Sequence, residues 1–242
     1  MKKEEKMIKL KNNSKLLISL IKIINNFNTE VDFTFAPEGI FLRVVDLSNT
    51  CLTVLKIKKE FFEEYAIEKE ITYTLDVKAL LIIINKISKN EFSMEIKPDG
   101  LHFDGKKDKF VLNSYVGNKD TRPIPEVKHT CKWIVNTADL FNNMEEVKEF
   151  SAVCKFSGED KLVMDIKSNL VSGKCDIEAE KVACDKAYCY YDMTYFEKIN
   201  ELVNIFDKIS FNYGKETPCV IEAKKDILEF YWMLASRVED KE

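Results

Sequence analysis

The residues of this chain whose types could support acid–base chemistry are two adjacent carboxylate pairs, Glu63-Glu64 and Glu145-Glu146. General acid–base catalysis needs such groups beside a nucleophile or a second titratable group. No glycine-rich phosphate loop, Gly-x-Ser-x-Gly turn or His-x-x-Glu-His segment accompanies them, and adjacent acids on helices are ordinarily solvated. The sequence therefore predicts a binding or scaffold protein, not an enzyme, and no cofactor.

Cysteine and histidine supply few candidate metal ligands. The seven cysteines contain no Cys-x-x-Cys pair, and the only histidines are His102 and His129. Structural zinc sites need four such ligands at short spacings, so we expect no metal site. In an intracellular chain of this length the cysteines are expected to be reduced and mostly buried.

The overall charge gives no sign of a nucleic-acid partner. The 242 residues include 37 basic and 41 acidic side chains, a formal net charge of -4, so any contact with DNA requires basic groups gathered on one face. The charged start is followed by no signal-peptide pattern, and the apolar run 16–24 is about half of the ~20 residues that span a bilayer. We expect a soluble intracellular protein.

Two segments combine helical periodicity with an excess of lysine. Apolar residues recur at helical spacing over 14–26 and 77–88, and Asp76 is placed to cap the second segment. The run 80–84 would also suit a strand, so that helix rests on its cap and its length. Their polar faces carry Lys11, Lys15, Lys22, Lys78, Lys86 and Lys89. On a single helix, a solvated surface is the ordinary explanation for such a face.

A β-hairpin is the clearest local structure. Pro37-Glu38-Gly39 predicts a turn, 40–45 alternate as a strand, and 51–57 return after Asp46-Leu47-Ser48-Asn49. We expect Asp46 to be a turn residue and hydrogen-bond acceptor. Further predicted elements of this half are a helical turn at 60–65 and strands at 70–75, 92–96, 101–103 and 110–112.

The second half repeats the pattern of the first. Periodicity is absent from 113–128, which holds two of the five prolines, so we predict domains at 1–112 and 129–242 joined by a connector at 113–128. Helices are expected at 137–150 and 193–206, and strands at 151–156, 162–166, 173–178, 187–191, 208–213, 219–223 and 227–234. This order predicts a duplicated α+β unit of helix, hairpin, helix and meander.

That order resembles the DNA sliding clamps of the PCNA family, of archaeal and eukaryotic type. The matching motifs are Glu38-Gly39-Ile40-x-Leu42 with Asp46-x-Ser48, the turn Lys59 to Tyr65, and the tail Phe230 to Asp240. The resemblance covers almost the whole chain. It implies a two-domain clamp fold in which three subunits form a ring, with antiparallel sheets outside and helices inside, around duplex DNA.

The resemblance also implies which residues face DNA. The six lysines above would lie near phosphate, since a mobile ammonium attracts phosphate without reading bases. The third and fourth helices carry Asn142, Glu145, Thr194 and Glu201 where clamps usually have basic residues, which leaves Lys148 and Lys198. Either the chain is a diverged homotrimer, which is the plainer interpretation, or it is one member of a heterotrimer.

Two further surfaces are implied by the resemblance. Partner proteins, such as a DNA polymerase and a clamp loader, dock peptides with a glutamine and two aromatics in a groove, here Val45, Thr50, Leu52, Val116, Ile124, Pro125, Met233, Leu234, Ala235 and Ser236. Val45 and Leu52 could equally be core residues. Subunits would pair Phe110, Val111, Leu112, Asn113 and Ser114 with Gly173, Lys174, Cys175, Asp176, Ile177 and Glu178.

The function expected from the resemblance is that of a processivity factor for DNA replication and repair. It would be cytoplasmic in a prokaryote and nuclear in a eukaryote. The alternative is a clamp-fold interaction subunit, of checkpoint or transcription type, that does not itself load as a homotrimer.

Overall fold

A computed structural model describes residues 7–10, 13–88 and 91–238. The chain forms two compact units. Unit 1 comprises Met1–Val45, Val54–Arg122 and Lys225–Glu229, and unit 2 comprises Asp46–Thr53, Pro123–Lys224 and Phe230–Glu242. The division passes through the predicted connector between Arg122 and Pro123, and again within three strands, β4 (Cys51–Lys58), β18 (Cys219–Lys225) and β19 (Leu228–Leu234).

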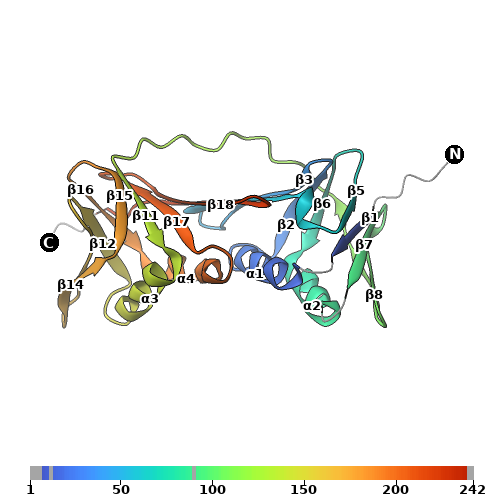
Figure 1. The fold of residues 1–242 in the computed structure, drawn as a ribbon, viewed down its shortest axis with the longest axis horizontal. Helices are drawn as coiled ribbons and strands as arrows, with labels where there is room; N and C mark the ends of the chain where they lie inside the picture. The colour runs from blue at the N-terminus through green and yellow to red at the C-terminus, as the bar shows by residue number, and fades with distance from the viewer. Residues whose placement is uncertain (1–6, 11–12, 89–90, 239–242) are drawn as a thin grey trace. The chain divides into compact units, whose positions relative to one another are not determined.

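Unit 1 places two helices, α1 (Ser14–Asn25) and α2 (Val77–Ile87), on one face of its strands (Figure 1). One sheet has the order β5-β1-β7-β8-β9, and the other strands follow the order β10-β6-β2-β3-β4. The pairs β1–β7, β2–β3, β2–β6 and β8–β9 are antiparallel. The bounds are β1 Met7–Leu10, β2 Glu30–Ala36, β3 Gly39–Val45, β5 Glu64–Ala66, β6 Ile71–Asp76, β7 Phe92–Lys97, β8 Gly100–Gly105, β9 Lys109–Asn113 and β10 Tyr115–Val116, with a 3-10 turn, η1, at Lys59–Phe61.

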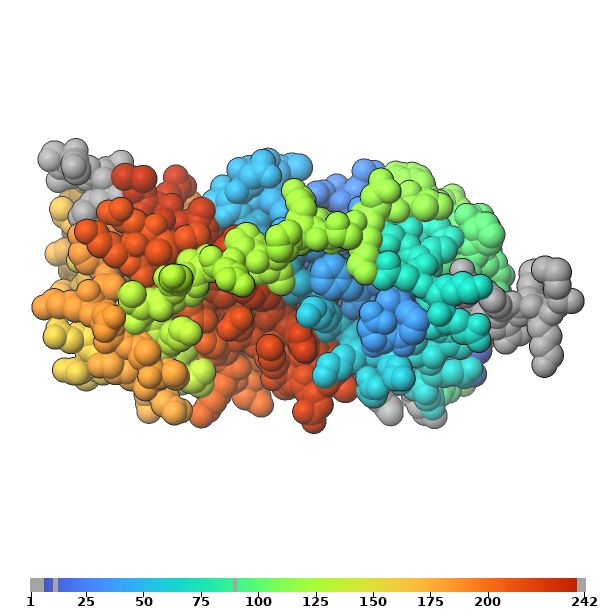
Figure 2. Space-filling view, turned by 90° about the horizontal axis from the view of Figure 1, so that it is seen from above, coloured from blue at the N-terminus to red at the C-terminus, as the bar shows by residue number. Residues whose placement is uncertain are grey.

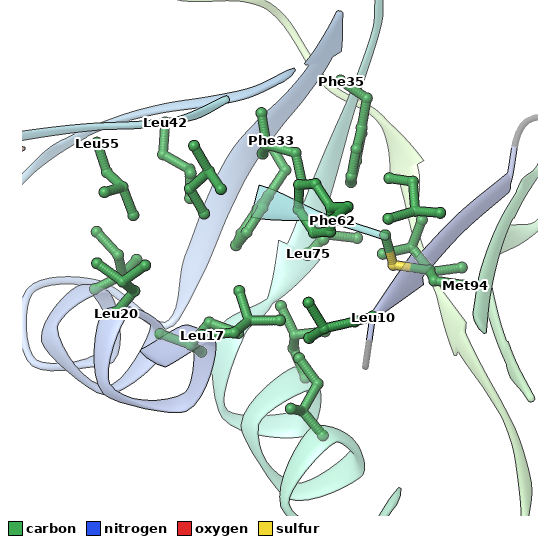
Figure 3. A pocket seen from close by; sticks show the side chains of 18 of the residues that line it. Leu10, Leu17, Leu20, Phe33, Phe35, Leu42, Leu55, Phe62, Leu75 and Met94 are labelled. Atoms are coloured by element: carbon green, nitrogen blue, oxygen red, sulfur yellow. The ribbon is translucent and has the colours of Figure 1, made fainter. Parts of the chain in front are cut away.

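The core of unit 1 lies between these helices and strands. Leu17 and Leu20 of α1 point toward Leu42 and Leu55 of the sheet (Figure 3). A small internal cavity there is lined entirely by apolar side chains. Asp76 caps α2 as predicted, since its Oδ1 accepts from the Ala79 amide at 2.7 Å. Burial of the apolar face explains why the β-branched run of α2 forms a helix.

Unit 2 has the same plan, with α3 (Thr137–Lys148) and α4 (Met193–Glu197) on one face of its strands (Figure 1). Its strands follow the orders β14-β13-β12-β16 and β19-β18-β17-β11-β15. The core contains an aromatic cluster in which Phe156 packs on Phe211 and Phe196 on Trp232, each pair with ring centroids 5.0 Å apart. The bounds are β11 Cys131–Asn136, β12 Val153–Gly158, β13 Leu162–Lys167, β14 Ser172–Ile177, β15 Ala179–Cys184, β16 Ala187–Asp192, β17 Lys208–Tyr213 and β18 Cys219–Lys225.

The predicted helix 193–206 is wrong in its length. Helix α4 ends at Glu197, and a 3-10 helix, η2, covers Asn200–Asn204. The Ile199 amide donates to the Phe196 carbonyl at 3.1 Å and the Leu202 amide to the Ile199 carbonyl at 2.9 Å. Phe196, Ile199 and Leu202 are all buried. Because they are three positions apart, a 3-10 helix, which has three residues per turn, places all three side chains on the same face.

Other differences concern short elements. The predicted helical turn at 60–65 is the 3-10 turn η1 followed by strand β5. Strands β1, β2, β11 and β15 were not predicted, although the alternating residues of β2 are a signal that could have found it.

The expectation of reduced cysteines is wrong for one pair. Cys131 and Cys184 form a disulfide because they lie directly opposite each other in the β11–β15 register. They are separated by 53 positions, so no local pattern indicates the pairing. The other five cysteines are free, and Cys51, Cys154, Cys189 and Cys219 are buried as expected. Burial raises the pKa of the Cys154 thiol to about 12.

The segment predicted as a connector is held at its start. Strand β10 pairs with β6, and the Gly117 amide donates to the Thr72 carbonyl at 2.9 Å. The Asp120 carboxylate contacts the Arg43 guanidinium at 3.1 Å and the Arg122 guanidinium at 2.6 Å. The segment lies on the surface of the molecule, drawn in yellow-green in Figure 2. Its first part thus belongs to unit 1, and Pro123 begins the part assigned to unit 2.

Gly39, which opens β3, has no room for a side chain. Its φ is +144°, and an added Cβ would collide with the Ile57 carbonyl oxygen and lie 2.9 Å from the Lys58 Cα. We expect Gly39→Ala to lower the free energy of unfolding by about 3 kcal/mol, measured by urea denaturation. Gly173→Ala is the matched control, since nothing lies within 4 Å of that Cβ, and it should change stability by less than about 0.5 kcal/mol. Equal losses in the two variants would contradict this explanation.

Candidate functional site

Helices α1 and α2 form the helix layer of unit 1, and its charged side chains are all positive. Lys15 and Lys22 of α1 and Lys78 and Lys86 of α2 are exposed, and neither helix contains an aspartate or glutamate. The two helices pack side by side, so four lysines and no acids give this layer a formal charge of +4. Lys11 and Lys89, also predicted to face DNA, lie outside the described residues. Such a layer attracts phosphate without base specificity.

The helix layer of unit 2 has the opposite sign. Its helices contain the acids Asp139, Glu145, Glu146, Glu197 and Glu201, against Lys148, and Lys198 directly follows α4. The five acids and one lysine of these helices give a formal charge of -4.

Both predicted basic positions of unit 2 are engaged by neighbours. Lys148 Nζ lies 2.6 Å from Glu145 and 3.2 Å from Glu197, so it links α3 to α4. The hydrogen bonds that Lys148 donates to the Glu145 and Glu197 carboxylates raise the pKa of Lys148. Lys198 Nζ lies 4.3 Å from the centroid of the Tyr195 ring. Phosphate would therefore meet net negative charge on this layer.

Asp46 is a buried hydrogen-bond acceptor in unit 2, as predicted. Its side chain is only 6% exposed, and Oδ1 accepts from the amides of Thr50 and Cys51 at 2.8 and 2.7 Å. Oδ2 accepts from the Ser48 hydroxyl and, at 3.0 Å, from the Tyr195 hydroxyl. Burial alone would raise the pKa of the Asp46 carboxyl, but these hydrogen bonds outweigh it and the pKa is lowered. The ionised carboxylate therefore holds the loop 46–50 in place.

Because the pKa of Asp46 is lowered in the folded state, its carboxylate stabilises the protein above the ordinary carboxyl pKa of about 3.9 and loses that effect as the pH falls through the folded-state pKa. We expect Asp46→Asn to lower the free energy of unfolding by about 2 kcal/mol near pH 7. The difference from the wild type should shrink toward about pH 3. Urea denaturation at both pH values measures it, and a difference independent of pH would contradict the assignment.

The predicted docking residues are divided between the units. Val45 and Val116 belong to unit 1, and the other eight belong to unit 2. Leu52 and Leu234 are 4% and 0% exposed, so the structure places them in the core and not on a surface. The Ala235 amide donates to the Thr50 carbonyl at 2.9 Å. Positions with accessible atoms in unit 2 are Thr50, Ile124, Pro125, Met233, Ala235 and Ser236, and their role stays a prediction.

The two predicted subunit-contact strands both lie at sheet edges. Strand β9 is last in β5-β1-β7-β8-β9, and β14 is first in β14-β13-β12-β16. The Gly105 amide bonds the Asp108 carbonyl at 2.9 Å, and hydrogen-bonded pairs alternate along an antiparallel ladder. With the observed register, the backbone N–H and C=O groups of Phe110 and Leu112 hydrogen-bond to β8. Those of Val111 and Asn113 point away from β8, toward the open edge of the sheet.

The same alternation applies to β14. The Ser168 amide bonds the Val171 carbonyl at 2.8 Å, which directs Gly173, Cys175 and Ile177 toward β13. The backbone groups of Lys174 and Asp176 then point away from the sheet. Each edge offers unpaired donors and acceptors, as strand addition requires.

Over 7–10, 13–88 and 91–238, no group of three or more histidine, cysteine or acidic side chains is arranged to hold a metal ion. Within the same ranges, no helix has the length and apolarity to span a membrane.

Comparison with known proteins decides the family. Residues 7–115 match the family described as "Proliferating cell nuclear antigen, N-terminal domain". The chain is 24% identical over 240 residues to "DNA polymerase sliding clamp 2" of Thermococcus kodakarensis, covering 92% of this chain and 93% of that one. Residues 7–115 thus form a PCNA-family N-terminal domain. The resemblance noted from the sequence is thereby confirmed.

Solved PCNA structures share the fold. PCNA of A. fulgidus, solved with the C-terminal region of FEN-1 bound, has a TM-score of 0.86 at 19% identity, over 97% of this chain and 99% of that one. The PCNA2–PCNA3 complex of Sulfolobus tokodaii has a TM-score of 0.83 at 18% identity, over 96% of this chain and 99% of that chain. The predicted α+β clamp fold is confirmed.

The sequence did not indicate the role of one residue, Tyr195. Tyr195 contacts Asp46 and Ser48, which lie 149 and 147 positions away. No local pattern could indicate this contact, because it depends on the fold that places Asp46–Thr53 in unit 2. The acidic character of the second helix layer, in contrast, could be read from the sequence.

Proposed function

We propose that this chain is a DNA polymerase sliding clamp that works without catalysis. Three copies would close a ring by adding β9 of one copy to β14 of the next, and duplex DNA would pass through it. The observation that carries the proposal is the acid-free, lysine-bearing layer of α1 and α2 in a chain with the clamp fold. Relatives named DNA polymerase sliding clamps support it.

Partner proteins would dock a short peptide against the tail strand of unit 2. The tail residues Met233, Ala235 and Ser236 retain accessible surface, and a docked peptide could pair with backbone groups of the tail. Aromatic anchors would supply most of the affinity. The A. fulgidus PCNA solved with the C-terminal region of FEN-1 supports this use of the fold. The protein would act in the cytoplasm of a prokaryote or the nucleus of a eukaryote.

The experiment that tests the proposal is primer extension on a long, singly primed circular template. With the cognate polymerase, clamp loader and ATP, the chain should convert short products into full-length ones. Omitting the loader or ATP is the control, because encirclement requires opening of the ring. No stimulation by a chain shown to be trimeric would contradict the proposal.

A heteromeric clamp subunit is the second candidate, favoured by the acidic helix layer of unit 2. Partner subunits could supply the positive charge that this layer lacks, and the Sulfolobus tokodaii PCNA2–PCNA3 complex supports such mixed assembly in the fold. Light scattering on the isolated chain separates the two. A homotrimer has three times the 28.2 kDa of the chain, or 84.6 kDa, and a strict monomer at micromolar concentration would favour the heteromer.

A further inference from the structure

Tyr195 joins helix α4 to the loop 46–50 inside unit 2. Its hydroxyl lies 3.0 Å from Asp46 Oδ2 and 2.8 Å from Ser48 Oγ. The Lys198 ammonium lies 4.3 Å from the centroid of the Tyr195 ring, a distance that favours a cation–π interaction. The side chain is therefore held at two places, by the loop at its hydroxyl and by Lys198, just after α4, at its ring.

The hydrogen bonds continue from this loop to the tail strand. Asp46 accepts from the Thr50 and Cys51 amides at 2.8 and 2.7 Å. The Thr50 carbonyl then accepts from the Ala235 amide at 2.9 Å. Tyr195, Asp46, Thr50 and Ala235 thus form one continuous set of contacts, and all four residues belong to unit 2.

We propose that Tyr195 is a positioning residue for the partner-peptide site. It fixes the Asp46 carboxylate, which sets the Thr50 carbonyl that holds the tail at Ala235. The inference rests on the proposed function, because it assumes that the tail docks peptides. Tyr195 itself need not touch the peptide.

The loop needs such support for a physical reason. Asn49 has a φ of +55°, a left-handed conformation that asparagine tolerates better than other residues with a side chain but that still disfavours this loop relative to an ordinary backbone. Hydrogen bonds to an ionised acceptor are stronger than neutral ones and can hold this conformation. When only a fraction of the molecules has the binding-competent conformation, the apparent Kd equals the intrinsic Kd divided by that fraction, and is therefore higher. Loss of the Tyr195 hydroxyl should therefore weaken peptide binding by populating other loop conformations.

The test is Tyr195→Phe, which removes the hydroxyl and keeps the ring beside Lys198. A fluorescein-labelled peptide with one glutamine and two aromatic residues is titrated by anisotropy at a temperature where all variants are folded. We expect the Kd to rise about fivefold. Hydrogen exchange of the Thr50 and Ala235 amides should become faster, while exchange in β17 and β18 stays unchanged.

The matched control is Tyr188→Phe. Tyr188 is also in unit 2 and has Lys155 Nζ 4.4 Å from its ring centroid, but it lies on β16, outside this set of contacts. Its variant should leave the Kd unchanged. Ser48→Ala removes an exposed hydroxyl that contacts both Asp46 and Tyr195, and it should also raise the Kd. This second variant keeps the test valid if Tyr195→Phe folds poorly.

The outcomes distinguish the inference from the proposed function. If the wild type binds the peptide and the Kd is unchanged in both Tyr195→Phe and Ser48→Ala, the inference is overturned and the proposed clamp function is unaffected. A lower unfolding midpoint with an unchanged Kd assigns Tyr195 a structural role only, which also overturns it. No peptide binding by the wild type contradicts the docking part of the proposed function itself.

Discussion

A Val111→Pro variant is expected to sediment as a 28.2 kDa monomer, whereas the homotrimer proposed for the native chain has three times that mass, 84.6 kDa. Val111 lies on the edge strand β9 and is 49% exposed. Its amide points away from β8, so proline removes a donor needed for strand addition without breaking the β8–β9 ladder. Sedimentation velocity at micromolar concentration measures the change. Stimulation of the polymerase should disappear with the trimer.

Val111→Thr is the matched control for this prediction. Threonine keeps the β-branched shape and the backbone amide, so its variant should remain trimeric. Lys174→Pro tests the opposite edge in the same way, because the Lys174 amide points away from β13. A trimeric Val111→Pro protein with a native circular-dichroism spectrum would show that β9 is not the subunit contact.

Reversing the charge of Lys15 and Lys78 is expected to abolish most DNA affinity. Each lysine near a phosphate releases counterions on binding, and a contact changes the slope of log K against log salt by about 0.9. A trimer with both substitutions loses up to six contacts, so the slope should fall by up to about 5 and the affinity at low salt by on the order of a hundredfold. Fluorescence anisotropy on a duplex over a series of salt concentrations measures both quantities.

The control for charge is Lys215→Glu with Lys224→Glu, two exposed lysines outside the helix layers. This variant has the same net charge and should keep the native salt slope. Glu146→Lys, on the acidic layer of unit 2, should change affinity in the opposite direction and tighten binding. Equal losses in both lysine pairs would assign the effect to overall charge and contradict a specific role for α1 and α2.

The helices and the hairpin were predictable because their signals are local. Asp76 caps α2 three residues from the amide that it accepts, and Gly39 opens β3 with a positive φ that only glycine adopts readily. The helix after Met193 was less predictable, since the choice between α and 3-10 geometry depends on the burial of Phe196, Ile199 and Leu202. Local propensity does not decide between two helical forms when packing favours one of them.

The lysine excess of α1 and α2 and the acidic residues of the later helices were fixed by the sequence itself, because charge and periodicity are properties of neighbouring positions. Only the tertiary structure decided which distant residues meet. It brought Cys131 to Cys184 across a strand register, placed Asp46–Thr53 in unit 2 and set Tyr195 against Asp46. These residues are 53 and 149 positions apart in the sequence and meet only because the folded chain packs their segments together. A pattern of neighbouring residues does not show which distant segments will pack.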